Sequence, residues 1–457
     1  MMLGCDHSSP PSESLSMMRD TSARHRSSAA GGSVRSRLAR PSNAAGASDC
    51  GKDGGIGLRM PIFVLSGSQV LGVLLGLAGL AYLAFALRST WRFRERPGVL
   101  PGWQPKVSVL KPLHGTAPHL YECLRSFCEQ DWPEYEVIFG AHTDSDPAID
   151  VVQQLIAEFP HRNLRLVVDA SLAGPNRKAA NLANICKLAQ HDIIVLADSD
   201  VRVDRNCIAA LAAPFTERTV GAVACLYKGL PVDGPVANFG ALHINDWLVP
   251  SVLVDVELRG IDFVFGAMSA VRRQALDEIG GFEHLSQGIA EDFAMGWLVS
   301  RKGWTVVLSP YACETVVAEG DFAALFLREV RWQQAERACR PLDQFLSVVT
   351  YPLPLLLLLL LPQPTVVGLI VIGMEIAARI ALHHQVRRSL AIATPPQPWL
   401  VPLRECVCFL AWAVSLVGNR TRWGQTTFSI SAFRKQMTAG SAPPVRLSAP
   451  VGAIEKR

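Results

Sequence analysis

The chain has 457 residues, of which 49% are hydrophobic and 18% are charged, and its formal net charge is +4. This length allows one large domain or two ordinary ones, and the apolar content is too high for a purely soluble enzyme. The mild charge, without a dense run of Lys and Arg, argues against a nucleic-acid-binding protein. Eleven cysteines without a C-x-x-C pair favour a reducing compartment and no disulfide framework.

The first 59 residues differ in composition from the rest of the chain. Residues 1–59 are rich in Ser, Ala, Gly and Arg and contain almost no large apolar residues, so they cannot build a core. We expect this segment to be disordered and dispensable. Because Met60 stands directly before an apolar run, a second hypothesis is that translation starts there.

The first apolar run predicts a membrane span. Residues 61–87 contain no charged residue and are long enough to cross a bilayer. A signal peptide is the rival interpretation, but the run is too long and lacks a clean cleavage site. Arg88, Arg92, Arg94 and Arg96 follow it, so the positive-inside rule places the chain from residue 88 onward in the cytoplasm.

Residues 100–340 alternate strand and helix patterns. Strands are expected at 106–113, 135–142, 164–169 and 192–198, with helices at 117–129, 148–158 and 178–189. Such alternation predicts an α/β domain with a mostly parallel sheet and helices on both faces. In sheets of this kind, ligands bind outside the carboxyl ends of the strands.

Charged side chains follow three of these strands. Lys111 ends the first, the pair Asp144 and Asp146 follows the second, and the pair Asp198 and Asp200 follows the fourth. An Asp-Ser-Asp triplet after a strand is consistent with a simple turn. It is also consistent with a clamp in which two carboxylates hold a divalent cation against a phosphate. Acids gathered at one sheet edge favour the clamp.

Two helical patterns carry further candidates. Glu291 and Asp292 start the pattern at 288–304, where they could complement the helix dipole or supply a general base. Arg328, Arg331 and Trp332 lie in a second pattern. The basic residues of this pattern could form a solvated face or contact a membrane surface. Alternatively, the two arginines could bind a diphosphate, with the tryptophan as an aromatic wall.

Three apolar runs precede the tail at 420–457. Residues 345–361 contain two prolines and could form a span, a re-entrant segment or an interfacial helix. Residues 365–382 and 403–418 are better spans, and the loop between them is expected to carry Arg387 and Arg388.

Within the run 365–382, two charged residues stand four apart. Glu375 and Arg379 can therefore pair on one helix face. Charged groups inside a span often mark a functional pathway, but an ion pair without function is equally consistent with the spacing.

Together, six segments resemble the inverting GT-A glycosyltransferases of families 2 and 21, in particular the ceramide glucosyltransferase family with its bacterial, hopanoid-associated relatives. The segments are "LKPLHG" (110–115), "YEVIFGAHTDSDPAID" (135–150), "NRKAANL" (176–182), "ADSDVRV" (197–203), "GIAEDFAMGWLVSRKGW" (288–304) and "REVRW" (328–332). The resemblance covers about 100–340 and the flanking spans. It implies a GT-A domain, which is a Rossmann-like nucleotide-diphospho-sugar transferase fold, flanked by transmembrane helices.

The resemblance also implies roles for individual residues, all of them expectations. Asp144 or Asp146 would hold the uracil of a UDP-sugar, and Lys178 and Asn181 would face the donor. Asp198 and Asp200 would carry Mn²⁺ or Mg²⁺ on the diphosphate. Asp292 would be the base, with Glu291 the next candidate. The clamp on the diphosphate and acceptor side would comprise Arg328, Arg331 and Trp332, and His243 falls where the family has a histidine near the site.

The implied function is transfer of glucose or N-acetylglucosamine from a UDP-sugar to the hydroxyl of a ceramide-type or hopanoid-type lipid, with inversion. The catalytic domain of such a multi-pass protein would lie on the cytoplasmic side of the inner membrane. A processive polysaccharide synthase shares these motifs but needs more spans to form a channel. A non-catalytic membrane scaffold would be expected to lose an acid or the Arg-Trp pair, and neither is lost.

Overall fold

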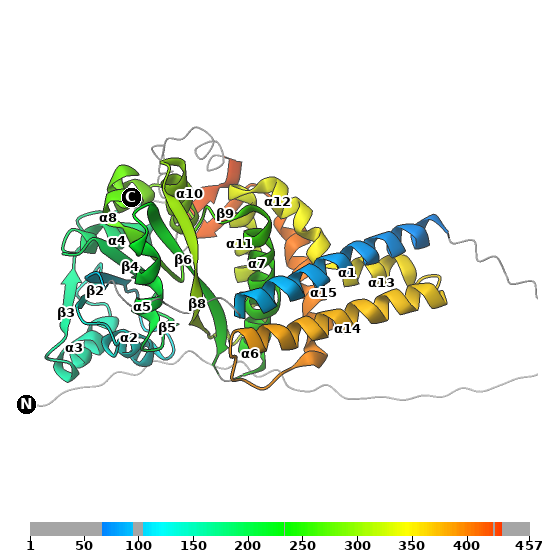
Figure 1. The fold of residues 1–457 in the computed structure, drawn as a ribbon, viewed down its shortest axis with the longest axis horizontal. Coiled ribbons are helices and arrows are strands. Elements are labelled where there is room, and N and C mark those ends of the chain that lie inside the picture. The colour runs from blue at the N-terminus through cyan, green and yellow to red at the C-terminus, as the bar shows by residue number, and fades with distance from the viewer. Residues whose placement is uncertain (1–65, 95–103, 233, 424–425, 432–457) are drawn as a thin grey trace, which may run out of the picture. The chain divides into compact units, whose positions relative to one another are not determined.

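A computed structural model of the chain describes residues 66–94, 104–232, 234–423 and 426–431 (Figure 1). The predicted segment 1–59 and most of the predicted tail lie outside the described residues, as do residues 61–65 of the first predicted span.

The four predicted strands form the first half of the sheet. β1 (Val107–Pro112) pairs in parallel with β2 (Tyr135–Ala141) and β4 (Ile193–Ala197), and β2 pairs in parallel with β3 (Asn163–Val168). Strands β1, β2 and β4 are buried along their whole length, as expected of apolar strands covered on both faces. The observed bounds lie within one residue of the predicted ones.

Helices connect these strands where the sequence predicts them. They are α2 (Leu120–Cys128), α3 (Ala148–Glu158) and α4 (Arg177–Cys186). The start of α4 is fixed by its N-cap, because the side chain of Asn176 accepts a hydrogen bond from the backbone N–H of Ala179.

The second half of the sheet departs from the predicted, mostly parallel arrangement. The strand order is β3-β2-β1-β4-β7-β6-β8-β5. β7 (Met268–Arg272) runs antiparallel between β4 and β6 (Val220–Pro231), whereas β8 (Thr305–Val317) is parallel to β6 and antiparallel to β5 (Val201–Arg202). The sheet is therefore mixed beyond β4, because β7 enters it from the opposite end.

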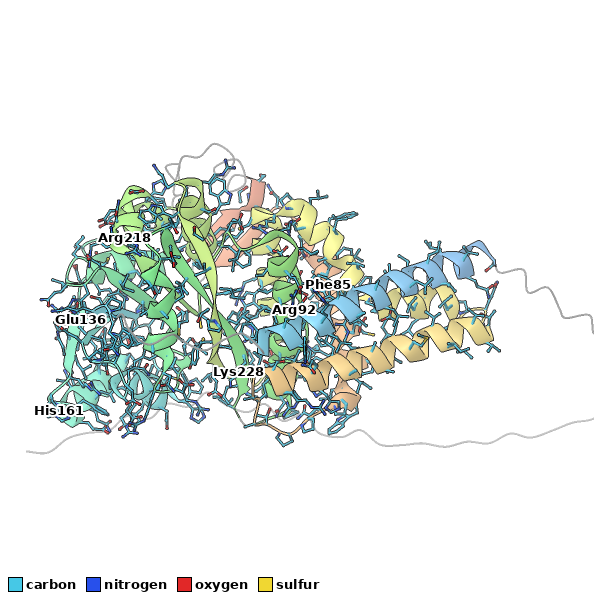
Figure 2. The ribbon with its side chains drawn as sticks, viewed as in Figure 1. Phe85, Arg92, Glu136, His161, Arg218 and Lys228 are labelled. Atoms are coloured by element: carbon cyan, nitrogen blue, oxygen red, sulfur yellow. The ribbon has the colours of Figure 1, made fainter. Side chains whose placement is uncertain are left out.

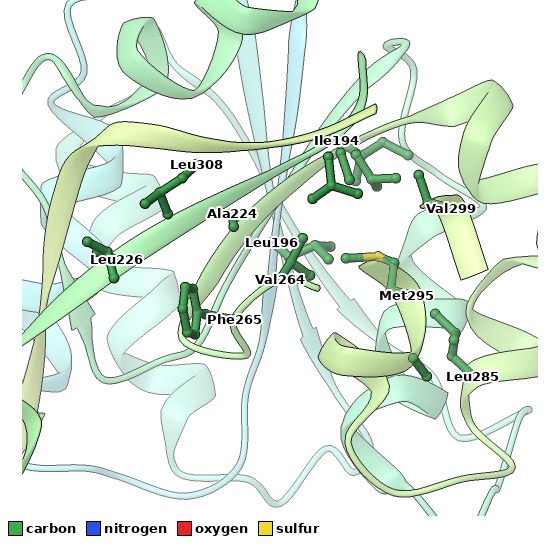
Figure 3. Close-up of a cluster of buried hydrophobic side chains, with 14 of the residues drawn as sticks. Ile194, Leu196, Ala224, Leu226, Val264, Phe265, Leu285, Met295, Val299 and Leu308 are labelled. Atoms are coloured by element: carbon green, nitrogen blue, oxygen red, sulfur yellow. The ribbon is translucent and has the colours of Figure 1, made fainter. Parts of the chain in front are cut away.

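Apolar clusters cover the two faces of the sheet. One cluster joins the sheet to α2, α3 and α5 (Cys207–Ala212). The other joins it to α4, α7 (Val249–Arg259) and α10 (Glu291–Arg301), and Figure 3 shows part of it around Leu196 and Met295. This second cluster extends into α1 and α14, since Leu83 and Leu382 belong to it. One continuous core therefore links the sheet to the apolar helices.

Among the described residues, three helices are long and apolar enough to cross a membrane. They are α1 (Gly67–Arg94), α14 (Val366–Ser389) and the helix Pro398–Ser415, which comprises η4 and α15 (Val401–Ser415). A fourth candidate is bent by 60° between the Pro341–Thr350 helix and α13 (Pro352–Leu360). Helices α1, α13 and α14 lie together and extend away from the sheet (Figure 1).

The packing of α1 depends on a stripe of glycines. A Cβ atom added to Gly72 would lie 2.5 Å from Leu360 Cδ2 on α13. At Gly76 it would lie 2.3 Å from Val371 Cγ1, and at Gly79 2.5 Å from Glu375 Oε1, both on α14. The small residues thus let three apolar helices approach closely.

The charged residues of α14 differ from the sequence expectation. Arg387 and Arg388 lie in its last turn and not in a loop. The side chain of Arg379 pairs with Glu405 of α15 at 3.1 Å and not with Glu375. Both carboxylate oxygens of Glu375 are without a hydrogen-bond partner among the described residues. The predicted pair is wrong because α15 brings a better-placed carboxylate across the bundle.

Polar contacts fix the sheet domain to the base of the helical bundle. Glu257 of α7 pairs with Arg88 and, at 2.5 Å, with Arg92 of α1. Lys228 of β6 donates to the carbonyl of Leu390, at the end of α14, over 3.0 Å. Figure 2 shows Arg92 and Lys228 at this joint.

The remaining elements complete the chain. They are η1 (Ala213–Thr216), α6 (Pro235–His243), the π turn η2 (Ile244–Leu248), α8 (Arg273–Glu278), α9 (Gly281–Leu285), α11 (Phe322–Cys339), α12 (Pro341–Leu346), η3 (Ser347–Thr350), β9 (Arg420–Trp423) and β10 (Thr426–Ser429).

Candidate active site

The Asp198–Ser199–Asp200 triplet forms a pinned turn between β4 and β5. The carbonyl of Asp198 accepts a hydrogen bond from the buried Lys111 Nζ (2.5 Å), and its N–H donates to the carbonyl of Ala267 (3.0 Å). The hydroxyl of Thr315 donates to the carboxylate of Asp200 over 3.5 Å. Neighbouring strands therefore hold the backbone of the turn, while both carboxylates remain partly exposed.

Lys178 connects the triplet to the Glu291–Asp292 pair. Its ammonium lies 2.6 Å from the carboxylate of Asp198 and 3.2 Å from that of Glu291. It also donates to the carbonyl of Gly266 over 2.9 Å. Residues from three separate predicted motifs thus meet around one cation.

The two acids at the start of α10 have different environments. Asn176 donates from its side-chain amide to Glu291 over 2.7 Å, so Glu291 is held by an amide and a lysine. Asp292 lies against the backbone of Gly266, where an added Cβ would be 2.9 Å from Asp292 Oδ2. The residue before them, Ala290, has φ of 52°, a strained conformation for alanine at the N-cap of the helix.

The pKa values follow from these environments. Burial opposes the charge of Glu291, but Lys178 and the hydrogen bond from Asn176 outweigh it and lower its pKa. Burial, and then the neighbouring charge of Glu291, raises the pKa of Asp292 to about 6, although Lys178 opposes the rise. A carboxylate with a pKa near neutrality is suited to accept a proton, whereas Glu291 is committed to its ion pair.

The neighbouring acids also change the pKa of Lys178. Burial opposes its charge, but Asp198, Glu291 and Asp292 outweigh burial and raise its pKa. Burial also raises the pKa of Asp198 to about 7, with Lys178 opposing the rise and Asp200 adding to it. Two carboxylates that repel each other on one turn are a suitable site for a divalent cation.

A divalent cation fits Asp198 and Asp200 by the chemistry of its ligands. Carboxylate oxygens suit Mg²⁺ and Mn²⁺. Within the described residues no cluster of three or more His, Cys, Asp or Glu side chains is arranged to enclose a metal. Two protein carboxylates would leave the other coordination positions to phosphate oxygens and water, as is usual for such ions at phosphate sites.

A pocket opens beside these charged groups. Its lining combines Lys178, Glu291, Asp292 and Gly266 with apolar side chains. The apolar part comprises Leu182, Leu196, Phe265, Phe282 and Met295, and the lining also includes Ser269.

The two acids after β2 have different surroundings, because one is bonded to its own loop and the other is exposed. Asp146 accepts hydrogen bonds from the N–H groups of Gly115 (3.0 Å) and Ala148 (3.0 Å), and its side chain is only 7% exposed. Asp144 is exposed. Of the two predicted uracil ligands, Asp144 is therefore the one with oxygens available to a ligand.

Asn181, which we predict to face the donor, lies between α4 and β2. It is buried, and its amide donates to the carbonyl of Gly140 in β2 over 2.8 Å. The side chain satisfies a strand end where Gly140 leaves room, because a Cβ on that glycine would lie 2.3 Å from Asn181 Oδ1. Asn181 is thus a structural residue of the α4–β2 contact.

The predicted clamp on α11 is divided between two environments. Arg328 is partly buried and pairs with Glu319, and its guanidinium carbon lies 4.7 Å from the Trp332 ring centroid. Arg331 is exposed on the same helix. The two arginines therefore do not form one fork, and Arg331 is the one free to move toward an anion.

His243 is buried against the bundle. Its Nδ1 lies 3.3 Å from Cys408 Sγ of α15 and 4.0 Å from the carboxylate of Glu329. Burial, with the charges of Arg404 and Arg328, lowers its pKa well below the usual range and keeps the ring neutral. Its ring centroid lies 6.2 Å from that of Trp332, so the histidine packs beside the helix α11 that carries the predicted clamp.

Two contributors to the site were not predicted from the sequence. The first is the segment 261–267, whose carbonyls at Gly266 and Ala267 hold Lys178 and the Asp198 turn. The second is Tyr227 of β6, whose pKa is raised by burial and then by the charge of Asp292, with Arg328 opposing the rise. The Gly that follows two phenylalanines in "FVFGAM" is a signal that could have pointed to the first.

Comparisons with known proteins identify the family of the chain. Residues 71–435 match glycosyl transferase family 21, so the chain belongs to that family. This match confirms the predicted resemblance and, with the mixed sheet observed here, the predicted α/β fold of the GT-A type.

Individual relatives are more distant. The chain is 26% identical over 243 residues to ceramide glucosyltransferase 1 of Caenorhabditis elegans. This alignment covers 52% of this chain and 51% of that protein. It is 36% identical over 110 residues to a ceramide glucosyltransferase of Komagataella phaffii, covering 23% and 21%. The match therefore spans about half the length of the nematode relative.

Among solved structures, the mannosyltransferase PcManGT from Pyrobaculum calidifontis, in complex with GDP-Man and Mn²⁺, aligns at 18% identity. The alignment has a TM-score of 0.49 and covers 76% of this chain and 99% of that chain.

Proposed function

We propose that the protein is a membrane-bound, inverting glycosyltransferase that moves a hexose from a UDP-sugar to the hydroxyl of a ceramide-like membrane lipid. The observation that carries the proposal is Lys178 bridging Asp198 to the Glu291–Asp292 pair, because it joins a cation-binding turn to a candidate base. The lipid acceptor is supported by the names of the relatives and by the helices fit to cross a membrane.

Each residue has a role in this chemistry. Asp292 accepts the proton of the attacking hydroxyl, which is worth roughly 10²–10⁴-fold in rate. Asp144 contacts the uracil, and Lys178 and Arg331 stabilise the departing diphosphate. Asp198 and Asp200 would hold Mn²⁺ or Mg²⁺, which would supply further positive charge at the leaving group. A single displacement inverts the anomeric centre, so an α-linked donor gives a β-glycoside.

The proposal includes an orientation in the membrane. Arg88 and Arg92 stand at the domain end of α1, so the positive-inside rule places the catalytic domain on the cytoplasmic side. Charged residues also lie at the domain end of α14, in its last turn.

The test is a donor and acceptor panel with the purified full chain in lipid nanodiscs. UDP-glucose, UDP-N-acetylglucosamine and GDP-mannose, each radiolabelled, are offered with ceramide, a hopanoid polyol or diacylglycerol. Label from a UDP-sugar moving into the chloroform phase with ceramide supports the proposal, and a hopanoid product would assign the other lipid class. Label in a water-insoluble polymer would instead identify a polysaccharide synthase, and absence of transfer from every donor would favour a scaffold.

A further inference from the structure

Residues 261–267 form a strap between α7 and β7 that contacts both halves of the candidate site. The Gly266 carbonyl accepts from Lys178 (2.9 Å), and the Ala267 carbonyl accepts from the N–H of Asp198 (3.0 Å). The Cα of Gly266 faces the carboxylate of Asp292. The place of the strap therefore determines how far the base lies from the cation-binding turn.

The strap also packs tightly on the helix that carries the base. A Cβ added to Gly296 of α10 would lie 2.5 Å from Phe263 Cα and 2.7 Å from the backbone N of Val264. The rings of Phe263 and Phe293 are stacked, with centroids 6.2 Å apart and an angle of 20°. Because Phe293 follows Asp292 in the chain, a shift of the strap is transmitted to the base.

Arg340 holds this assembly from the junction of α11 and α12. Its guanidinium pairs with Asp262 of the strap and lies 3.3 Å from Asp255 of α7. The guanidinium carbon is 5.3 Å from the Phe263 ring centroid and 5.4 Å from that of Phe293. One side chain thus contacts α7, the strap and α10, using charge and the flat face of the guanidinium together.

The element that follows Arg340 has an exposed apolar face. Asp343 of α12 lies 3.7 Å from Arg340, and exposed apolar residues follow along α12 and η3. They are Leu342, Phe345, Leu346 and Val349. Arg340 therefore stands between the apolar segment that leads into α13 and the helix that carries Asp292.

We infer that Arg340 is a positioning residue for the transfer reaction, which fixes the strap and the start of α10 so that Asp292 faces the pocket beside Asp198. This inference rests on the proposed function for its kinetic consequence, but not for its structural one. Arg340 touches neither the pocket lining nor the D-x-D turn, so its effect reaches the site through Asp262, Phe263 and Phe293.

Arg259 provides a matched control in the same charge cluster. It pairs with Asp343 at 3.0 Å and with Asp255, two of the three acids that Arg340 contacts. No contact joins it to Asp262 or to either phenylalanine ring. Removing Arg259 therefore perturbs the cluster without releasing the strap.

The kinetic test compares Arg340→Leu and Arg340→Lys with Arg259→Leu in nanodiscs. Misplacing a catalytic group by about 1 Å costs up to about 10²-fold, so we expect kcat for lipid glycosylation to fall about 10–10²-fold in Arg340→Leu. The fall in kcat should exceed any rise in the donor KM, and Arg340→Lys should recover part of kcat because it keeps the charge. Arg259→Leu should stay within about twofold of the wild type.

Hydrogen exchange provides a second readout that does not require activity. In Arg340→Leu, the backbone amides of residues 261–267 and 291–295 should exchange about tenfold faster, while those of β1 and β2 keep wild-type rates. Arg259→Leu should leave the strap protected. If Arg340→Leu does not insert stably, Arg340→Lys is measured in its place.

The outcomes separate this inference from the proposed function. An inactive wild type would overturn the proposed function, whereas the exchange data would still decide whether Arg340 holds the strap. Equal exchange and equal kcat in the Arg340 and Arg259 variants would overturn the inference while leaving the transferase intact. A donor KM that rises without any loss of kcat would also contradict it, because Arg340 would then act on donor binding and not on the position of Asp292.

Discussion

Glu291 and Asp292 are adjacent carboxylates with opposite pKa shifts. Lys178 and Asn176 satisfy Glu291, so its pKa is lowered. Burial, and then the negative charge of Glu291, raises the pKa of Asp292 to about 6. Different environments of two nearby acids are how proteins assign separate roles to them. At the residue scale, this difference supports the proposal that Asp292 is the base, while Glu291 pairs with Lys178.

We predict that Asp292→Asn lowers lipid transfer by about 10²–10⁴-fold, because asparagine keeps the size of the side chain but accepts no proton. Donor affinity should change little, since Asp144, Lys178 and the metal bind the donor. Single-turnover transfer and donor calorimetry measure the two quantities. Wild-type transfer by the variant, or loss of donor binding in place of chemistry, would make Glu291 the next candidate.

The same assignment fixes a pH dependence. The base must be ionised, so kcat/KM should fall about tenfold for each pH unit below the pKa of Asp292, near 6, and level off above it. Saturating Mn²⁺ keeps Asp198 ionised and removes its titration from the profile. The acidic limb should disappear in the residual activity of Asp292→Asn, and an unchanged limb there would assign the titration to another group.

Asp144 and Asp146 should respond differently to removal. Asp146→Ala leaves the N–H groups of Gly115 and Ala148 without their partner, which costs about 1–3 kcal/mol of stability. Asp144→Ala should preserve the unfolding temperature and weaken UDP-sugar binding. Thermal unfolding and donor titration of both variants distinguish them. Reversed results would show that Asp146 is the uracil ligand.

The spacing of the motif located Asp144 and Asp146 but did not show which of them has carboxylate oxygens available to a ligand. Two acids two residues apart are equivalent in a pattern, and only the folded loop shows that Asp146 is occupied by backbone N–H groups. The pattern likewise does not show that the amide of Asn181 donates to the end of β2. Hydrogen bonds between distant segments decide both cases, and a local pattern does not contain them.

At the scale of elements, the first half of the domain was predictable and the second was not. The runs that form β1 to β4 alternate with helices, so period and length identify them. The strands β6 and β8 pair along ten or more residues but are not separated by a regular strand–helix alternation. β7 occupies the centre of the sheet through antiparallel contacts with strands far away in the chain. Strand order of this kind is set by tertiary packing.

The glycine stripe of α1 leads to a prediction about helix packing. Gly76→Leu would drive a side chain into Val371 of α14, and overpacking of this kind costs about 1–3 kcal/mol. Gly373→Leu on α14 is the control, because nothing lies within 4 Å of an added Cβ there. Thermal unfolding in one detergent should show a lower midpoint for Gly76→Leu only. Equal midpoints would mean that α1 does not pack through this face.

At the scale of the whole molecule, buried ion pairs connect the catalytic domain to the helical bundle. Glu329 of α11 pairs with Arg404 of α15, and both side chains are fully buried. The guanidinium of Arg404 also lies 4.6 Å from the Phe239 ring centroid of α6. Since α11 carries Arg328, Arg331 and Trp332, this pair fixes the clamp helix to a candidate membrane span.

We predict that Arg404→Leu alone destabilises the protein by about 3–5 kcal/mol, because it leaves the Glu329 carboxylate buried without its partner. The double variant Glu329→Leu/Arg404→Leu should regain most of that loss, since two apolar residues leave no unpaired charge. Chemical unfolding of the single and double variants completes the cycle. A double variant no more stable than Arg404→Leu would show that the pair is not the source of the loss.

The most direct test of the central claim, inverting transfer of a hexose to a membrane lipid, is the anomeric configuration of the product. The full chain in nanodiscs is given UDP-α-glucose, ceramide and Mn²⁺, and the chloroform-soluble product is examined by proton NMR. We expect a β-glucosyl lipid whose yield is strongly reduced with Asp292→Asn and in the presence of EDTA. An α-glucosyl lipid, a polymer, or a product formed equally well by Asp292→Asn would contradict the claim.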